Sequence, residues 1–132
     1  MPLVDYLPPE AICTDLEPQK RDQSLEALLD VMVEAGSLGA DVKAEALEAL
    51  VNRERLGSTA IGNGIAVPHA RMDAVDGIAV AMGVCPEGVE FNALDGQPAH
   101  QIFLVLGPRE NPEVYVDVME RITNLVQNAD FR

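Results

Sequence analysis

His69 is the residue in this sequence whose surroundings best suit covalent chemistry. It directly follows Pro68, whose ring fixes the backbone just before the histidine, and arginines lie on both sides of it at Arg53 and Arg71. A neutral imidazole nitrogen is a nucleophile at physiological pH without any cofactor. Attack on a phosphoryl group requires in-line positioning and donors for the equatorial oxygens. The sequence therefore predicts a histidine that accepts a phosphoryl group, provided that such donors converge on it.

The segment from Gly57 to Gly64 precedes His69 and is rich in residues that tolerate positive φ or bond their own backbone. We interpret it as a loop, followed by a short strand at Ile65–Val67 that ends at Pro68-His69. Ligands of open α/β sheets bind just beyond strand ends, which favours a site at His69. The candidate phosphate donors are the backbone N–H groups of Gly62, Asn63 and Gly64, the hydroxyl of Thr59 and a guanidinium from one of the two flanking arginines.

Other functional patterns in the sequence are weaker. The Gly62–Gly64 segment precedes a strand, so it is not a dinucleotide fingerprint, and no Gly-Lys-Ser/Thr follows it as in a nucleotide P-loop. Two distant histidines and two cysteines, Cys13 and Cys85, make a zinc site improbable. Asp73 and Asp76 have the chemistry to bind a hard cation, but an isolated acidic pair is usually a solvated loop. We expect no metal and no cofactor, and we interpret the cysteines as reduced thiols.

Apolar periodicity predicts the elements that position His69. A helix is expected over Leu25–Val33 and ends at Gly36, and a second helix is expected from about Asp41 to Gly57. Continuous apolar runs predict buried strands at Ile78–Cys85 and Gln101–Leu106, and Ala11–Thr14 suits a short strand. Pro86–Gly88 is expected to be a turn. Histidine 100 merely precedes a strand and needs no functional explanation.

The last expected helix has Asn111 as its N-cap and Pro112 at its first position. Its predicted buried stripe consists of Val114, Val118, Ile122, Leu125 and Val126. Helices that alternate with continuous apolar strands are typical of an α/β fold with helices on both faces of the sheet.

Composition excludes several partners. With 132 residues the chain fits one domain, and nine Lys and Arg against 22 Asp and Glu give a net charge of −13. A chain this acidic has no footprint for nucleic acid, and an anionic membrane surface is an equally poor partner. Neither a transmembrane segment nor a signal peptide is visible, so we expect a cytoplasmic protein.

The segment Asn52–Arg71, which reads NRERLGSTAIGNGIAVPHAR, resembles the signature of the fructose/mannitol-type IIA domain of the bacterial phosphotransferase system (PTS). It is most similar to the stand-alone nitrogen-regulatory IIA proteins, and the resemblance extends over nearly the whole chain. It implies a mixed, mostly parallel β-sheet flanked by helices on both faces. It also implies that His69 accepts a phosphoryl group from a histidine of HPr or of its nitrogen-branch counterpart. Arg53 and the Ser58-Thr59 segment would support the site, without a metal.

The sequence departs from this family in two respects. Members usually carry a second active-site histidine, where this chain places Tyr115. Tyr115 is either an ordinary partly buried tyrosine or a hydroxyl donor to a phosphate oxygen in place of the imidazole. Members also usually continue with another helix, so residues 1–132 are expected to be a single IIA domain that lacks it.

Three functions follow from the resemblance. The preferred one is a regulatory phosphocarrier whose phosphorylation state controls the partner that it binds. The second is a sugar-transport component that passes the phosphoryl group from His69 to a separate IIB protein. The third is a binding module that has kept the fold and lost the transfer. As a phosphotransferase component with a phosphohistidine intermediate, the chain is expected to show no turnover by itself.

Overall fold

The computed structural model describes residues 7–17, 20–75, 77–93, 95–110 and 112–127. Its elements follow one another in a mixed order of helices and strands. They are η2 (Pro9–Ala11), β1 (Ile12–Cys13), α1 (Arg21–Glu34), η3 (Ala40–Val42), α2 (Lys43–Leu56), β2 (Ala60–Gly62), β3 (Ile65–Ala66), β4 (His69–Arg71), β5 (Ala79–Val89), β6 (Ala99–Gly107) and α3 (Pro112–Gln127).

The described strands form one sheet with β6 at its centre. The strand order is β1-β5-β6-β3-β2, and β4 also pairs with β6. The pairs β1–β5, β3–β6 and β4–β6 are parallel, whereas β5–β6 and β2–β3 are antiparallel. β6 is buried from Ile102 to Gly107, as expected of a central strand that is covered on both faces. The predicted mixed, mostly parallel sheet is therefore confirmed.

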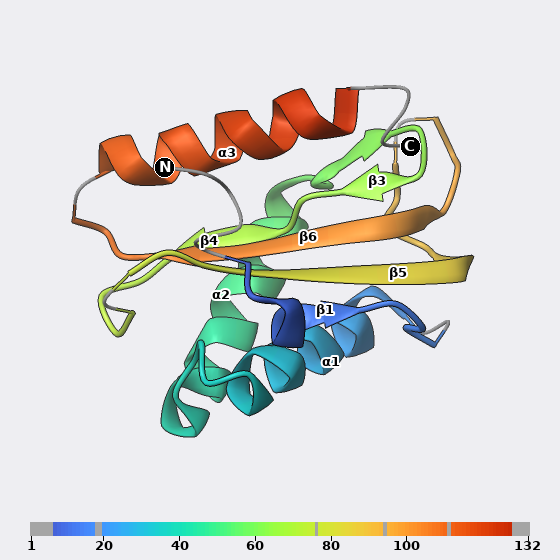
Figure 1. The fold of residues 1–132 in the computed structure, drawn as a ribbon. Coiled ribbons are helices and arrows are strands. Elements are labelled where there is room, and N and C mark those ends of the chain that lie inside the picture. Colours follow the sequence, from blue (N-terminus) through green and yellow to red (C-terminus); the bar gives the residue numbers. More distant parts are fainter. Residues whose placement is uncertain (1–6, 18–19, 76, 94, 111, 128–132) are drawn as a thin grey trace.

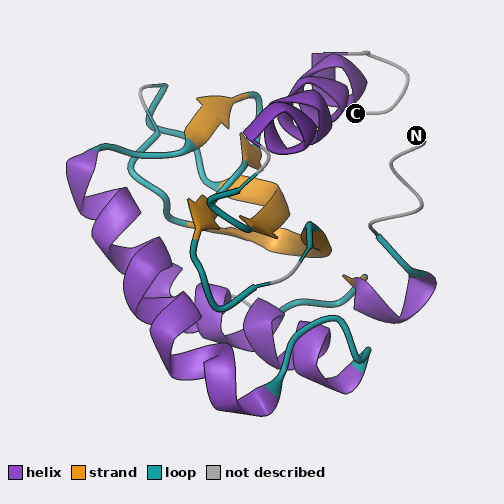
Figure 2. Cartoon of the chain, turned by 90° about the vertical axis from the view of Figure 1, so that its left-hand side faces the viewer, coloured by secondary structure: helices purple, strands orange, loops and turns teal. Residues whose placement is uncertain are grey.

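Helices lie on both faces of this sheet, as predicted. α1 and α2 cover one face and α3 lies across the other (Figure 1), and the end-on view of Figure 2 shows the same three layers. α1 buries the leucines of its predicted stripe together with Met32, while Val33 is only half-buried. The second helix begins as the short turn η3 and continues as α2, which buries Ala46 and Leu50. No helix of the described residues is long and apolar enough to cross a membrane.

The buried stripe of α3 differs from the predicted one. Tyr115, Val118 and Ile122 are buried, whereas Val114 is 43% exposed. Adjacent residues of a helix point about 100° apart, so a stripe that starts at Tyr115 turns Val114 toward solvent. Leu125 is half-buried. The expected N-cap Asn111, the side chain of Val126 and the end of the chain lie outside the described residues.

His69 lies next to a gap between two short strands, β3 and β4, which pair with β6 one after the other. β3 pairs with Gln101 and Ile102 of β6, and β4 pairs with residues 105–107 of the same strand. The interruption falls at Val67-Pro68, because proline has no N–H for the sheet ladder. The predicted end of the short strand at Pro68 is therefore confirmed, but the chain rejoins the sheet at once, since His69 begins β4.

The predicted loop before His69 is largely a β-hairpin. β2 and β3 pair antiparallel, and Asn63-Gly64 connects them with positive φ values of 58° and 78°. This is the backbone that a two-residue hairpin turn requires. The predicted turn at Pro86–Gly88 is also wrong, because these residues lie inside β5. There the pairing with β6 shifts register between Val84 and Val89.

Candidate functional site

The hydrogen bond of the His69 ring decides which of its nitrogens is free to react. Nδ1 lies 2.9 Å from the carbonyl oxygen of Val67. A carbonyl oxygen can only accept, so Nδ1 carries the proton and donates it. The lone pair is therefore on Nε2. The half-buried His69 side chain lines a surface cavity of about 800 Å³, and Nε2 is the ring nitrogen with the chemistry of a nucleophile.

Three arginines line the same cavity, from three different elements. Arg53 comes from the last turn of α2, Arg71 from the end of β4 and Arg109 from the segment after β6. Within the described part of the chain, the ion pairs are made by other residues, and none of these arginines has a carboxylate partner. The whole chain has only nine Lys and Arg. A third of its cationic side chains therefore gathers beside one histidine.

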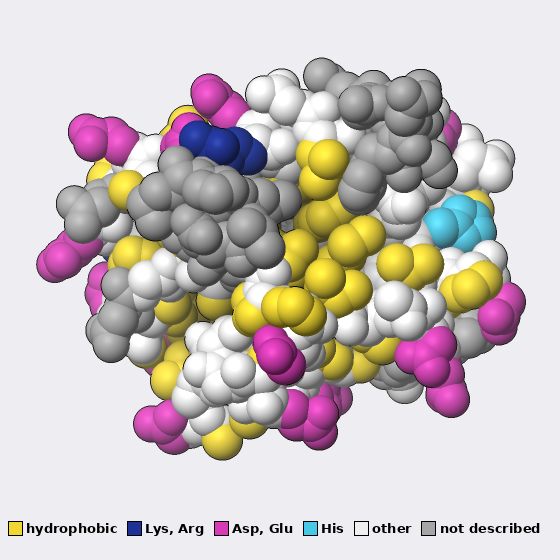
Figure 3. Space-filling model, viewed as in Figure 1, with side chains coloured by type: hydrophobic (Ala, Val, Ile, Leu, Met, Phe, Trp, Pro, Cys, Tyr) yellow, Lys and Arg dark blue, Asp and Glu magenta, His cyan; other side chains and the backbone are white. Residues whose placement is uncertain are grey.

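The charge elsewhere on the surface contrasts with this cavity. On the face drawn in Figure 3, Asp and Glu side chains are spread around the margin, whereas Lys and Arg form one small group. Unpaired guanidinium groups provide planar forks of N–H donors that suit phosphate oxygens. The concentration of arginines at His69 in a chain of net charge −13 therefore marks an anion site.

Tyr115 stands beside His69 at the start of α3. The two ring centroids are 6.4 Å apart, and Arg71 Cζ lies 5.5 Å from the centroid of the tyrosine ring. The Tyr115 hydroxyl is buried and has no hydrogen-bond partner among the described residues. Burial raises the pKa of Tyr115 to about 12, although the nearby Arg71 and Arg53 act in the opposite direction. Tyr115 is thus a neutral phenol at physiological pH and can donate a hydrogen bond.

Arg53 is the predicted supporting residue that the structure places in the cavity together with His69 and Tyr115. Its Nη1 donates to the carbonyl oxygen of Gly57 at 2.8 Å, which links the side chain to the end of its own helix. The following residue, Glu54, is buried and accepts hydrogen bonds from the hydroxyl and the backbone N–H of Thr59. These contacts fix the end of α2 and with it the position of Arg53.

The hydroxyls of Ser58 and Thr59 have partners away from His69. Ser58 Oγ donates to the carbonyl oxygen of Phe91 and accepts from the N–H of Ala60 at 3.0 Å. The Thr59 hydroxyl donates to Glu54. Neither residue lines the cavity of His69. Their expected contacts with phosphate stay a prediction, and this geometry does not supply them.

Gly62, Asn63 and Gly64 also lie away from His69. The N–H of Asn63 donates to Asp95 Oδ2 at 3.2 Å, and the carbonyl oxygen of Gly64 accepts from His100 and Gln101. The hairpin is therefore level with the beginning of β6, whereas His69 pairs with Val105. Four residues of strand separate the two levels by roughly 13 Å. The role of these N–H groups in phosphate binding likewise stays a prediction.

Sequence reasoning missed Arg109, and for Arg71 it noted only that this arginine follows His69. Both lie at a strand end: Arg109 follows the buried β6, and Arg71 is the last residue of β4. Arginines at strand ends become a signal only once the strands are known to pair in parallel, because such ends then meet at one edge of a sheet. A second cavity of about 490 Å³ adjoins the site and is also lined by His69 and Tyr115, together with the α3 residues Val116, Met119, Glu120, Thr123 and Asn124.

Among the described residues, no group of three His, Cys, Asp or Glu side chains is arranged to hold a metal ion. Asp76, half of the acidic pair considered from the sequence, lies outside them. Cys13 is half-buried and Cys85 is buried, and both are free thiols.

Comparison with known proteins places these features in a family. Residues 5–132 match the sequence model of "Phosphoenolpyruvate-dependent sugar phosphotransferase system, EIIA 2". The chain is 34% identical over 125 residues to a PTS system fructose-specific EIIA component of Haloferax volcanii, covering 95% of this chain and 80% of that protein. It is 31% identical over 130 residues to a nitrogen regulatory protein of Bradyrhizobium diazoefficiens, covering 98% of this chain and 83% of the relative.

A solved structure shows the same fold. The crystal structure of nitrogen regulatory protein IIA-Ntr from Neisseria meningitidis superposes with a TM-score of 0.85 at 29% sequence identity, covering 96% of this chain and 84% of that chain.

Proposed function

The chain belongs to the EIIA 2 family of the phosphoenolpyruvate-dependent sugar phosphotransferase system, and on this premise we propose that it carries a phosphoryl group on Nε2 of His69. The observation that carries the proposal is the hydrogen bond from Nδ1 to Val67, which leaves the Nε2 lone pair on the wall of an arginine-lined cavity. Both the nucleophile and the groups that stabilise the phosphoryl oxygens belong to this one chain.

The transfer step is balanced without a cofactor. The bond between phosphorus and the donor's ring nitrogen breaks, and its electron pair stays on that nitrogen. The Nε2 lone pair of His69 forms the new bond to phosphorus. The His69 ring keeps its proton on Nδ1, where it is hydrogen-bonded to the Val67 oxygen, and the ring becomes positively charged. The donor ring, protonated in its phosphorylated state, becomes neutral. Positive charge therefore moves between rings with the phosphoryl group, and no proton has to cross the interface.

The residues around His69 stabilise the phosphoryl oxygens in this proposal. Arg53 contributes charge from the α2 side of the cavity, and the Tyr115 hydroxyl donates a neutral hydrogen bond from α3. A buried preorganised donor, as the Tyr115 hydroxyl is, contributes roughly 2.7–4 kcal/mol of transition-state stabilisation, and the half-buried Arg53 contributes less. The Ser58-Thr59 and Gly62–Gly64 segments act indirectly, since they shape the end of α2 and the sheet edge.

The phosphoryl donor is a histidine-phosphorylated protein, HPr or its nitrogen-branch counterpart, in the cytoplasm. The downstream step has two candidates, because the relatives include both nitrogen regulatory proteins and fructose-specific components. In the regulatory case the phosphorylation state controls binding to a target protein. In the transport case a IIB protein accepts the phosphoryl group from His69.

The test is to incubate the chain with phosphoenolpyruvate, enzyme I and each donor, and to measure its intact mass. We expect an acid-labile gain of one phosphate in the wild type and none in His69→Ala. Because His69 is half-buried at the start of an edge strand, circular dichroism should show that the variant keeps the fold. Absence of phosphate from the wild type with every active donor would contradict the proposal and favour the binding-module function.

A second experiment separates the two downstream candidates. The phosphorylated chain is mixed with purified IIB domains, and loss of phosphate from His69 is followed over time. Transfer to a IIB protein supports the sugar-transport function. Retention of the phosphate, with target binding that differs between the two states of His69, supports the regulatory one.

A further inference from the structure

Arg71 and His69 project from the same side of one short strand. Both belong to β4, and Ala70 between them is buried against the core. Side chains alternate across a strand, so residues two apart point the same way, with Cα atoms roughly 7 Å apart. That spacing lets a guanidinium reach a group bonded to the histidine ring, because the arginine side chain spans a similar length. Arg71 is therefore in register with the nucleophile.

The ring of Tyr115 holds the Arg71 side chain in place. The guanidinium carbon lies 5.5 Å from the ring centroid, within the range of a cation–π contact. The same ring lies 6.4 Å from the His69 ring. Tyr115 thus contacts both residues and bridges them from α3. A contact with an aromatic face orients the cation but leaves its N–H groups without acceptors.

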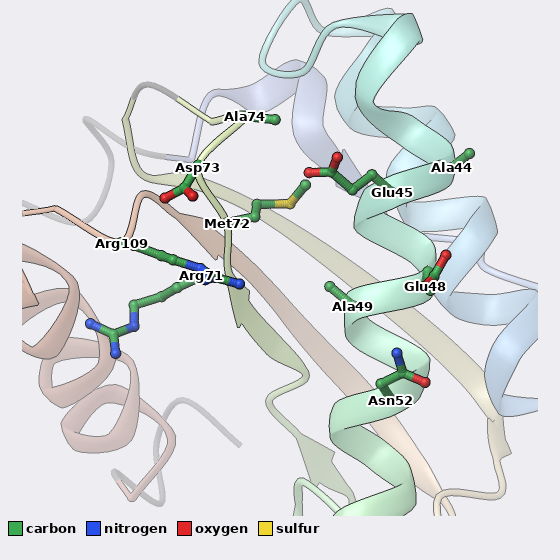
Figure 4. A pocket seen from close by; sticks show the side chains of 10 residues that line it. All are labelled: Ala44, Glu45, Glu48, Ala49, Asn52, Arg71, Met72, Asp73, Ala74 and Arg109. Carbon is green, nitrogen blue, oxygen red and sulfur yellow. The ribbon is translucent and has the colours of Figure 1, made fainter.

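Carboxylates near Arg71 do not neutralise it. Glu45 and Glu48 of α2 and Asp73 line the adjacent cavity of about 980 Å³ together with Arg71. Figure 4 shows that the Arg71 side chain extends toward α3, away from the two glutamates on α2. The ion pairs of the described residues are all made by other side chains. Arg71 is accordingly a charged side chain that the Tyr115 ring positions, and its N–H groups can donate hydrogen bonds to a ligand.

We propose that Arg71 binds the phosphoryl group on phosphorylated His69, and that the ring of Tyr115 is the positioning residue that aims it. The inference rests on the proposed function and adds a residue to it. Two guanidinium N–H groups would donate to two oxygens of the phosphoryl dianion, which is the fork geometry of arginine–phosphate pairs. Arg53 has fewer N–H groups available for a phosphoryl group than Arg71, since its Nη1 already donates to the carbonyl oxygen of Gly57.

The experiment phosphorylates histidine with phosphoramidate, which needs no protein donor. A His100→Gln background confines the signal to His69, and the pH titration of the phosphoryl group is followed by ³¹P NMR. A cation that binds the dianion lowers its pKa. In Arg71→Gln the titration midpoint should therefore move to higher pH, and Arg71→Lys should move it less. An unchanged midpoint in Arg71→Gln would overturn the proposal.

The matched control is Arg121→Gln. It makes the same change in net charge, but Arg121 pairs with Asp117 on the exposed side of α3 and lines neither cavity of His69. Its midpoint should equal that of the wild type. An equal shift in both variants would assign the effect to net charge and contradict a contact with Arg71.

The role of the Tyr115 ring is tested by combining variants. The effect of Arg71→Gln should persist in a Tyr115→Phe background, which keeps the ring, and shrink in Tyr115→Leu, which removes it. Equal effects in both backgrounds would contradict the positioning role.

Enzymatic transfer from the protein donor gives the second readout. We expect it to slow by roughly ten- to a hundredfold in Arg71→Gln, less than the hundred- to thousandfold loss for a buried donor, because Arg71 is exposed. If no protein donor phosphorylates the wild type, the proposed function fails, while the chemical titration still decides whether Arg71 contacts the phosphoryl group.

Discussion

A single backbone carbonyl selects the reactive nitrogen of His69. Pro68 interrupts the strand between β3 and β4. The carbonyl oxygen of Val67, next to this interruption, accepts a hydrogen bond from Nδ1 of His69. The backbone of Val67 and Pro68 thus orients the side chain of His69. The proline that marked His69 in the sequence acts in two ways, because it fixes the chain before the histidine and interrupts the ladder beside it.

Tyr115 allows stability and function to be separated. Its hydroxyl is buried without a partner among the described residues, and a buried polar group without a hydrogen bond is destabilising. We expect Tyr115→Phe to leave the free energy of unfolding at pH 7 unchanged or to raise it by about 1 kcal/mol. Phosphoryl transfer to His69 should slow in the same variant. Urea unfolding and transfer kinetics measure the two effects, and a clear loss of stability would show that the hydroxyl has a partner.

The same substitution has a pH signature. The pKa of Tyr115 is raised from its ordinary value of 10 to about 12, so the folded protein holds this proton more tightly than the unfolded chain. The resulting stabilisation is intact below pH 10 and is lost as the pH rises toward 12. Unfolding of the wild type at increasing pH should therefore show a decline over this range that is smaller in Tyr115→Phe.

Side-chain identity predicted part of the site and missed the rest for a physical reason. His69, Arg53 and Tyr115 do line one cavity. The hydroxyl of Ser58 instead bonds Phe91, a residue 33 positions away. Such a partner depends on how distant segments pack, and no local spacing reports it. Arg109 was missed for the same reason, since only the parallel pairing of β4 with β6 places the two strand ends together.

At the scale of elements, long periodic segments were predicted more completely than short ones. α1, α2, β5 and β6 lie where apolar periodicity placed them, although β5 and β6 extend beyond the predicted bounds. Of the β2–β3 hairpin, β3 was predicted as a short strand, but β2 and the turn were interpreted as a loop despite the Asn63-Gly64 sequence, which is a strong hairpin signal. Its strands are only two and three residues long, too short for an alternating pattern to show.

The approach of α3 to the sheet depends on Gly107 at the end of β6. A Cβ at this position would lie 2.6 Å from Cδ1 of Tyr115 and 2.8 Å from Cδ1 of Ile78. Gly107→Ala should therefore push the Tyr115 ring away from the sheet and cost about 1–3 kcal/mol of stability, as overpacked cores do. Transfer to His69 should also slow, because Tyr115 moves relative to both His69 and Arg71.

A second glycine provides the control. A Cβ at Gly77 would meet nothing within 4 Å, so Gly77→Ala should change the free energy of unfolding by less than about 0.5 kcal/mol. Chemical denaturation of both variants measures the difference. Equal stability of Gly107→Ala and Gly77→Ala would show that α3 tolerates a side chain under Tyr115, against the close approach described here.

At the scale of the whole molecule, a negative net charge surrounds a local cluster of positive charge. The net charge is −13, yet Arg53, Arg71 and Arg109 gather at the cavity of His69. Under the proposed function, we expect the long-range field to attract a donor with a basic face and the arginines to act at short range on the phosphoryl group that this donor carries. The acidic surface therefore governs the encounter, and the cationic cavity governs the transfer.

This division predicts how salt affects the reaction. Ions screen the field beyond about 10 Å at 0.1 M ionic strength and affect close contacts much less. Doubling the ionic strength from low salt should slow bimolecular transfer from the protein donor at subsaturating concentration. At saturating donor, where encounter no longer limits the rate, the rate should change less. Stopped-flow or quenched-flow kinetics at several salt concentrations measure both regimes. If the subsaturating rate does not depend on salt, the acidic surface has no part in steering, and the site works through its short-range arginines alone.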